Sequence, residues 1–499
     1  MSSNDTTLEL IRLFVLLVGA AALVTILARR INLPYTVALV GFGLLAGAFA
    51  QPLRVEITPQ LVLVVLLPAL IFEASYQTDF AKLRPSLGGV ALLAGPGVMI
   101  SAAVIAAALH LGAGLAWPES FVVGAMLSAT DPAAVIATFK SLHSPRRLAT
   151  LVEAESVFND GTGIVIFAIA VDFVTRPVGP AEVAFAFVSV VAISATLGAI
   201  CGFAASRILP NVGDHLIEIS LSVVLAYGTY LVADALHQSG VIATAVAGIV
   251  LGNYGRRLGL SERTQEALDT VWEFVAFLAT AFIFLVVGFA ISARSLGDVA
   301  LPIAWAIAAS LLGRAVIVYG LLGGWRLLRR ARLGRSHNSA APTSAAGAVM
   351  TPTAGTAAAA GAVAVTAPSN AASTATPSAA GYAAPSTVRR RPSLGSRPGP
   401  DEGSLPFAWL HVVFWSGLRG AVSTALALSL PVDFPDRAAL QGITFGVVLF
   451  TLLVQATTAE LVVGKWGRKA HPTRKSPADS GASPGVEQLR ARSEPRSTP

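Results

Sequence analysis

The stretch LVEAESVFNDGTGIVIF, residues 151–167, places polar side chains inside an otherwise apolar segment that predicts a membrane-spanning helix. Glu155 and Asn159 are four residues apart, and so are Ser156 and Asp160, so a helix would present all four on one broad face. Their carboxylate, hydroxyl and amide oxygens are hard donors, which suit a small hard cation. Polar packing between helices is the alternative, and it fits Ser156 and Asn159 better than the isolated carboxylate of Asp160.

The composition of the whole chain favours a polytopic all-α membrane protein over a soluble one. Of the 499 residues, 54% are apolar and 13% are charged, whereas about 25% of residues are charged in an ordinary soluble domain. The single cysteine, Cys201, excludes an internal disulfide. Apolar stretches recur and predict about thirteen transmembrane helices, of which the second and the ninth are short. These helices are predicted at residues 8–28, 33–50, 60–80, 86–110, 119–140, 150–174, 181–208, 215–236, 239–254, 268–291, 299–323, 406–430 and 437–463.

The basic residues predict the orientation of these helices. The loops on one side contain basic pairs, such as Arg29 with Arg30 and Arg146 with Arg147, whereas the opposite loops hold single arginines such as Arg54. The positive-inside rule then predicts a multi-pass protein of the plasma or inner membrane, with its N-terminus outside and its C-terminus in the cytoplasm. Attraction to the anionic lipid bilayer explains the net charge of +7, so no nucleic-acid partner is predicted.

Composition also divides the chain into segments. Residues 1–330 hold the first eleven predicted helices, and residues 405–463 hold the last two. Between them, residues 331–404 are rich in Ala, Pro, Ser and Thr without apolar periodicity, which predicts a disordered cytoplasmic linker. The basic tail, residues 464–499, is interpreted in the same way.

Several charged residues lie near the midpoints of their predicted helices. An ionisable side chain at that depth costs roughly 2.5–3.5 kcal/mol on insertion scales, so it normally faces a polar interior. Because all of them fall at a similar depth, one polar site at the membrane midplane explains them better than unrelated exceptions. These residues are Glu73, Asp131, Asp160, Arg314 and Arg419, and Glu155 lies just over one turn from Asp160.

Two of the predicted helices, 119–140 and 406–430, contain residues that interrupt a helix. Pro132 disfavours helical geometry at Asp131, and glycines flank Arg419. One early and one late interrupted helix are typical of inverted-repeat secondary transporters with a site at the midplane. Compensation of the exposed helix ends is the favoured role for Asp131, at an N-terminus, and for Arg419, at a C-terminus, ahead of direct contact with an ion.

Arg314 needs an anionic partner, because arginine stays protonated even in a membrane interior. Glu155 is a candidate, since it is a second carboxylate near the midplane. Binding of an anionic substrate by Arg314 is the alternative.

Five motifs resemble the Asn-Asp branch of the cation/proton antiporters, which contains NhaP-type antiporters and the animal sodium/proton exchangers. The resemblance implies an NhaA/NhaP-like fold and a homodimer of thirteen-helix protomers. Each protomer would have a scaffold of helices 1–3 and 7–10 and a moving core of helices 4–6 and 11–13. The motifs are IFE (71–73), ATDP (129–132), FNDG (158–161), GRAVIVY (313–319) and GLRGA (417–421).

The resemblance also implies roles for individual residues. It places Na+ on Asp160, with Ser156, Glu73 and the main chain of Thr130 nearby, and it gives Asn159 a supporting role. It implies an ion pair between Glu155 and Arg314. It implies no cofactor beyond the transported Na+ or Li+ and H+. The linker at 331–404 departs from the family's pattern, which leaves regulation open.

Competition between ions at one carboxylate is the expected mechanism. Midplane burial disfavours the ionised form of Asp160, so this residue should hold either a proton or a metal cation. We therefore expect electroneutral 1:1 exchange of Na+ for H+, because Asn159 stands where the electrogenic branch has a second aspartate. K+/H+ exchange is the alternative, since oxygen ligands alone do not set selectivity. An ion channel or an intramembrane enzyme is a more distant alternative; the chain has no HExxH motif and its histidines are scattered.

Overall fold

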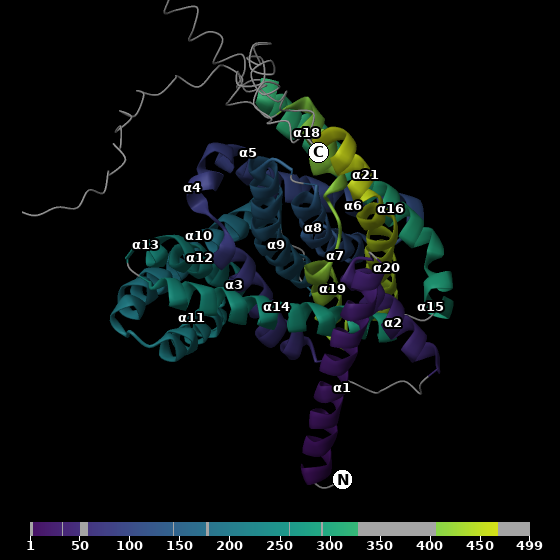
Figure 1. Ribbon diagram of the computed structural model, residues 1–499. Helices are drawn as coiled ribbons and strands as arrows, with labels where there is room; N and C mark the ends of the chain where they lie inside the picture. The colour runs from purple at the N-terminus through teal and green to yellow at the C-terminus, as the bar shows by residue number, and fades with distance from the viewer. Residues whose placement is uncertain are drawn as a thin grey trace, which may run out of the picture. The chain divides into compact units, whose positions relative to one another are not determined.

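The structure is a computed structural model that describes residues 3–31, 33–49, 58–142, 144–175, 179–258, 260–290, 293–327 and 406–467 (Figure 1). All regular secondary structure within these ranges is helical. The predicted linker, 331–404, and the part of the predicted tail from residue 468 onward lie outside the described residues.

The described helices follow one another along the chain, and residues 328–405 lie outside the described ranges. The first are α1 (Ser3–Arg30), α2 (Tyr35–Phe49), η1 (Leu61–Leu66), α3 (Leu67–Gln77), α4 (Phe80–Leu83), η2 (Arg84–Ser86), α5 (Leu87–Leu92), η3 (Leu93–Gly97), α6 (Val98–Ala113), α7 (Trp117–Met126), α8 (Ala133–Ser141) and α9 (Arg146–Thr175). Next come α10 (Pro180–Ile208), η4 (Leu209–Asn211), α11 (His215–Ala235), α12 (Gly240–Val250), η5 (Leu251–Gly255), α13 (Arg256–Leu258), α14 (Glu262–Ala290), α15 (Ala293–Asp298), α16 (Ala300–Ala315) and η6 (Val316–Leu322). The last are α18 (Phe407–Trp415), α19 (Ala421–Leu428), α20 (Arg437–Phe450), η7 (Thr451–Ala456), α21 (Thr457–Val462) and η8 (Val463–Gly467).

Every predicted transmembrane range coincides with helical structure, so the predicted fold class is confirmed. The ranges 119–140 and 406–430 are each split into two shorter helices, and the final helix continues to Gly467 instead of ending at residue 463. Within the described residues, 7 helices are long and apolar enough to cross a membrane, and Tyr35–Gly47 and Leu61–Gln77 are shorter apolar helices. The 7 are Leu87–Ala113, Arg146–Val174, Ala184–Asn211, His215–Ala235, Glu262–Phe289, Ala300–Leu327 and Arg437–Gly467.

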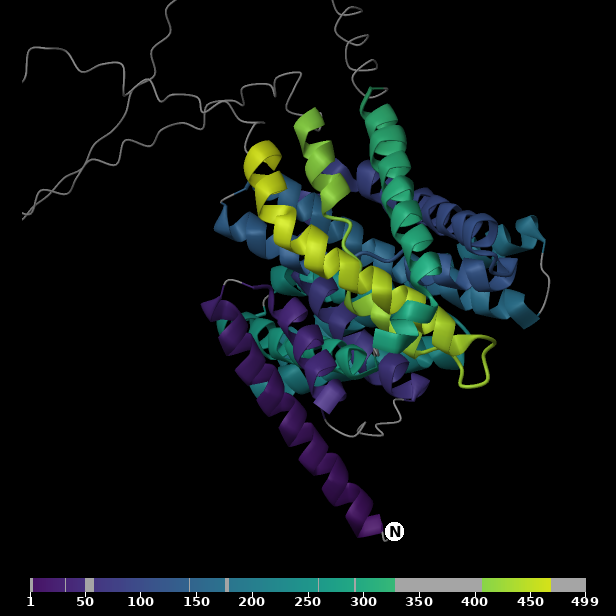
Figure 2. The same cartoon turned by 90° about the vertical axis from the view of Figure 1, so that its right-hand side faces the viewer.

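The helices pack in two groups. One, here called the scaffold group, contains α1, α2, α3, α10, α11, α12 and α14. The other, the core group, contains α6, α7, α9, α16, α19 and α20. The groups meet where α9 packs against α10 and α12 and where α19 packs against α14. Figure 2 shows α1 on the flank of this assembly, with its N-terminal end projecting beyond the other helices.

Close backbone approach holds the scaffold group together where α2 crosses α14. A Cβ atom on Gly288 would lie 2.4 Å from the carbonyl oxygen of Val40, and one on Gly43 would lie 2.5 Å from the carbonyl oxygen of Leu285. Without a hydrophobic driving force between helices in lipid, such small residues allow the contact that van der Waals packing needs. Gly43 and Gly288 are therefore required at this crossing.

A helical turn with an interior proline contacts the helix that carries Asp160. Pro96 has no N–H to donate, and the helix between Leu87 and Ala113 widens around it at η3. Nearby, the carbonyl oxygen of Ala94 accepts a hydrogen bond from Thr162 Oγ1 on α9 at 2.6 Å. The irregular turn is thus tied to α9, close to the polar residues of that helix.

Candidate ion-binding site at the crossing of two interrupted helices

Two extended breaks cross inside the core group. Helix α7 ends at Met126 and α8 begins at Ala133, because Pro132 prevents the helix from continuing through Asp131. Helix α18 similarly ends at Trp415, and α19 begins at Ala421, so five residues separate these two helices. The main-chain N–H of Asp131 donates to the carbonyl oxygen of Leu418 at 2.9 Å, which joins the two breaks.

Each break carries one charged residue. The side chain of that residue contacts the end of a helix that borders the other break. The Nη1 atom of Arg419 donates to the carbonyl oxygens of Ser128 and Ala129, at 2.8 and 3.0 Å, just beyond the C-terminus of α7. Asp131 Oδ2 accepts from the N–H of Ala421, at 3.2 Å, at the N-terminus of α19. Since helix C-termini carry partial negative charge and N-termini partial positive charge, both side chains have the sign that stabilises the end they contact.

Helix α9 is fastened to the first break by two side chains. Ser156 Oγ donates to the carbonyl oxygen of Thr130. Asn159 Nδ2 donates to Thr130 Oγ1 at 3.0 Å and to the carbonyl oxygen of Ser128 at 3.3 Å. Ser156 and Asn159 are buried, so these bonds hold α9 against the non-helical main chain of the break.

Two side-chain oxygens of α9 accept no hydrogen bond from the described residues. They are Asn159 Oδ1 and Asp160 Oδ1, and both atoms are buried. A buried acceptor without a donor is costly, and a carboxylate oxygen more so than an amide oxygen. A proton or a hard cation would satisfy such oxygens, because both interact with carboxylate and amide oxygen.

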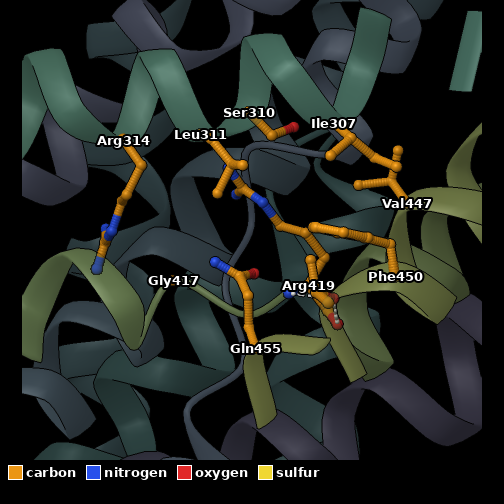
Figure 3. Close-up of a pocket in the computed structure, with 10 residues that line it drawn as sticks. Ile307, Ser310, Leu311, Arg314, Gly417, Arg419, Val447, Phe450 and Gln455 are labelled. Atoms are coloured by element: carbon orange, nitrogen blue, oxygen red, sulfur yellow. Dashed lines mark hydrogen bonds between the residues drawn. The ribbon is translucent and has the colours of Figure 1, made fainter. Parts of the chain in front are cut away.

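Glu155 and Arg314 form a buried ion pair. Arg314 Nη1 donates to Glu155 Oε1, and Nη2 donates to Glu155 Oε2 at 3.0 Å and to the carbonyl oxygen of Val413 at 2.7 Å. The two side chains are 2% and 7% exposed, so each charge depends on the other. A Cβ atom on Gly417 would lie 2.6 Å from Arg314 Nε, so the glycine leaves room for the guanidinium beside the second break (Figure 3).

Comparison with known proteins agrees with this architecture. A family model described as "Sodium/hydrogen exchanger, transmembrane" matches residues 17–389. The chain belongs to the sodium/hydrogen exchanger family. It is therefore a multi-pass membrane transporter and not an enzyme.

Relatives of this exchanger extend over most of its length. It is 34% identical to the Na(+)/H(+) antiporter ApNhaP of Aphanothece halophytica over 90% of this chain and 73% of that protein. It is 34% identical to the low-affinity Na(+)/H(+) antiporter NhaS1 of Synechocystis over 87% of this chain and 69% of that protein. The solved structure of the sodium proton antiporter MjNhaP1 from Methanocaldococcus jannaschii at pH 8 aligns with a TM-score of 0.65 and 18% identity. That alignment covers 93% of this chain and 99% of the other, and it shows that the fold is shared.

Glu73 of the exchanger lies on α3 in the scaffold group. This helix borders neither of the two breaks. Its side chain is half-buried, and Oε1 accepts from Gln77 Nε2 at 2.6 Å. Helix α3 packs against α9, which carries Asp160. Glu73 thus stands on the scaffold side of the boundary between the two helix groups, whereas the other predicted site residues stand on the core side.

The candidate site also contains hydrogen-bonding groups that the sequence analysis did not single out. They are the main-chain carbonyls of Ser128, Ala129 and Val413, and the hydroxyl of Ser423, which donates to the Ala129 carbonyl at 3.2 Å. Every residue has a carbonyl, so no side-chain pattern marks the ones that a helix break leaves unpaired. The break at Pro132 is the one sequence signal that could have pointed to Ser128 and Ala129.

Proposed function

We propose that the exchanger is a secondary active antiporter that exchanges Na+, or Li+, for H+. The observation that carries the proposal is the pair of buried oxygens, Asp160 Oδ1 and Asn159 Oδ1, beside the crossing of two interrupted helices. Relatives that match most of the chain are named Na(+)/H(+) antiporters, which supports the same substrates here. Such a protein would serve sodium transport and pH homeostasis at the cell membrane.

The charges around the crossing favour a 1:1 exchange. Glu155 is paired with Arg314, and Asp131 and Arg419 each lie at a helix end of opposite sign. Among the carboxylates on the core side, Asp160 is then the one whose charge is left for a cation or a proton to neutralise. Either ion produces a loaded form of the same net charge, and occupancy by one excludes the other. This balance of charges supports membership of the Asn-Asp, electroneutral branch of the family.

The proposed ligands of Na+ are Asp160, Ser156, Glu73 and the main-chain oxygen of Thr130. Ser156 and Thr130 already bond to one another, but a hydroxyl oxygen and a carbonyl oxygen each have two lone pairs. Both can therefore contact a cation while their mutual hydrogen bond remains. Asn159 acts in support, since its Nδ2 atom holds the Thr130 hydroxyl in place.

The separation of helices into two groups suggests how the site reaches both sides of the membrane. We infer that the core group rocks against the scaffold group when Asp160 is neutralised, and that the empty, charged site crosses poorly. The scaffold group would also provide the surface for a homodimer. The basic loops support the predicted orientation, with the N-terminus outside and the C-terminus in the cytoplasm.

Dequenching of a pH-sensitive dye in everted membrane vesicles tests the substrate directly. After the vesicles are acidified, Na+, Li+ and K+ are added in turn, and Na+ and Li+ should each dissipate the pH gradient in a saturable way. A response to K+ alone would instead identify a K+/H+ antiporter. A cation current that does not saturate and needs no opposing gradient would identify a channel.

A further inference from the structure

A small cavity lies beside two buried arginines, Arg314 and Arg419. It is enclosed by α16, the break before α19, α20 and η7, and Figure 3 shows the side chains around it. Its volume is about 10 Å³, which is close to the least space that holds one water molecule. The lining contains two guanidinium groups and no carboxylate. The lining residues are Ile307, Ser310, Leu311, Arg314, Gly417, Arg419, Val447, Phe450, Thr451 and Gln455.

Arg314 has one side-chain nitrogen, Nε, that makes no hydrogen bond to the described residues. Nη1 and Nη2 bond to Glu155 and to the Val413 carbonyl, but no described group accepts from Nε. Arg314 is 6% exposed, so bulk water does not reach this donor freely. Gly417 borders Nε, and a Cβ atom at that position would lie 2.6 Å from it. Any side chain at position 417 would therefore clash with the guanidinium at Nε.

Gln455 brings a second unsatisfied group to the same cavity. The residue is 2% exposed, and its Oε1 atom accepts no hydrogen bond from the described residues. In Figure 3 its amide lies between the side chains of Arg314 and Arg419. A terminal amide can present either its oxygen or its nitrogen to a neighbour after a half-turn, so Gln455 can donate to or accept from a molecule in the cavity.

We propose that the cavity is a binding site for one ordered water, held between Arg314 Nε and the side-chain amide of Gln455. The water accepts from Nε and bonds to the amide, so that each nitrogen of the arginine that neutralises Glu155 has a partner. Water fits better than a halide ion, because the cavity is the size of one water and Arg314 is already paired with a carboxylate. A further buried charge would also have to be desolvated.

Ser310 lines the cavity but is not part of the proposed water site. Its hydroxyl oxygen is buried without a partner among the described residues, and it lines the same cavity. In Figure 3, however, the hydroxyl points towards the side of Ile307, away from Arg314. The proposed water is therefore assigned to Gln455 and Arg314 and not to Ser310.

A high-resolution structure of the full chain, crystallised in sodium bromide, tests the proposal. We expect one rounded density peak within hydrogen-bonding distance, about 2.7–3.2 Å, of both Arg314 Nε and the Gln455 amide, with no anomalous bromide signal. An anomalous peak there would overturn the water assignment in favour of a halide, and an empty cavity would overturn the site altogether. The unmodified protein alone decides between these outcomes.

Two matched glutamine variants extend the test. Gln455→Met keeps the side-chain size and removes the amide, so the peak should be lost. Gln441→Met is the control, because the Gln441 amide on α20 bonds directly to the Ala427 carbonyl at 2.8 Å and does not line the cavity. The peak should persist in this control, and persistence in Gln455→Met would remove Gln455 from the site. None of these readouts requires transport, so the outcome is independent of the proposed exchange.

Discussion

The main-chain N–H of Asp131 donates to the main-chain carbonyl of Leu418 across 2.9 Å, and this bond joins the two interrupted helices where they cross. On one side of it, the Thr130 carbonyl is held by Ser156, and on the other, Arg419 reaches the carbonyls that follow α7. The geometry of the candidate site is therefore set by the backbone of two segments that are distant in sequence.

Replacement of Asp160 by Asn should abolish exchange. The amide has nearly the same size as the carboxylate, but it cannot take up a proton or supply a negative charge to Na+. Purified variants in proteoliposomes would be compared by Na+-dependent proton movement. Asp172→Asn, an exposed position on the same helix, is the control and should retain exchange. Exchange by Asp160→Asn at the rate of the control would remove Asp160 from its central role.

An imposed membrane potential should not drive transport if the exchange is 1:1. Asp160 is neutralised by one Na+ or one H+, so no net charge moves in a cycle. Proteoliposomes with a potassium diffusion potential and equal pH on both sides should show no Na+ uptake against its gradient. Uptake that follows the sign of the potential would show that more than one proton moves for each Na+.

Glu155→Gln should destabilise the protein strongly. It leaves the guanidinium of Arg314 buried without a carboxylate, and breaking a buried ion pair in this way costs about 3–5 kcal/mol. The apparent melting temperature in detergent would be compared with that of Glu153→Gln, which removes the same charge two residues earlier on α9. Replacing Arg314 with Met in the Glu155→Gln background should recover part of the loss. Equal melting temperatures for the two single variants would contradict the structural importance of the pair.

Gly420→Ala should disturb the second break without changing any charge. The added Cβ would lie 2.2 Å from Asp131 Oδ2 and 2.4 Å from Asp131 Cβ, so Asp131 must move away from the N–H of Ala421. We expect a loss of about 1–3 kcal/mol, as for other overpacked sites, together with slower exchange. Gly228→Ala on α11 is the control, since its nearest neighbour would be Val224 Cγ1 at 3.9 Å. If both variants melt and transport alike, the close approach at Gly420 is not needed.

Cysteine labelling in intact cells should reveal the predicted orientation. In a Cys201→Ser background, Ala116→Cys lies in a predicted outer loop and Arg84→Cys in a predicted inner loop, and both positions are exposed. A membrane-impermeant maleimide added outside should label position 116 and not position 84, and permeabilised cells should label both. The reverse pattern would invert the topology inferred from the basic residues.

The sequence by itself determined the fold class and predicted which polar residues belong to the candidate site. Apolar stretches can only be buried in lipid or in protein, so their lengths predicted the spans, and Pro132 predicted where one of them breaks. Charges are expensive at midplane depth, which marked Asp160, Arg314 and Arg419 as residues that must face a polar interior. These inferences rest on local properties of the chain, which need no knowledge of its neighbours.

Only the tertiary structure decided which groups meet. Sequence could suggest that Arg314 needs an anion, but the contact with Glu155 and the Val413 carbonyl depends on how α9, α16 and α18 pack. Likewise, no pattern of residues could show that Arg419 serves the end of α7 while Asp131 serves the start of α19. Main-chain carbonyls carry no sequence signature, and contacts between distant segments are set by packing. The arrangement of charges at the crossing therefore emerges only when the two interrupted helices are brought together.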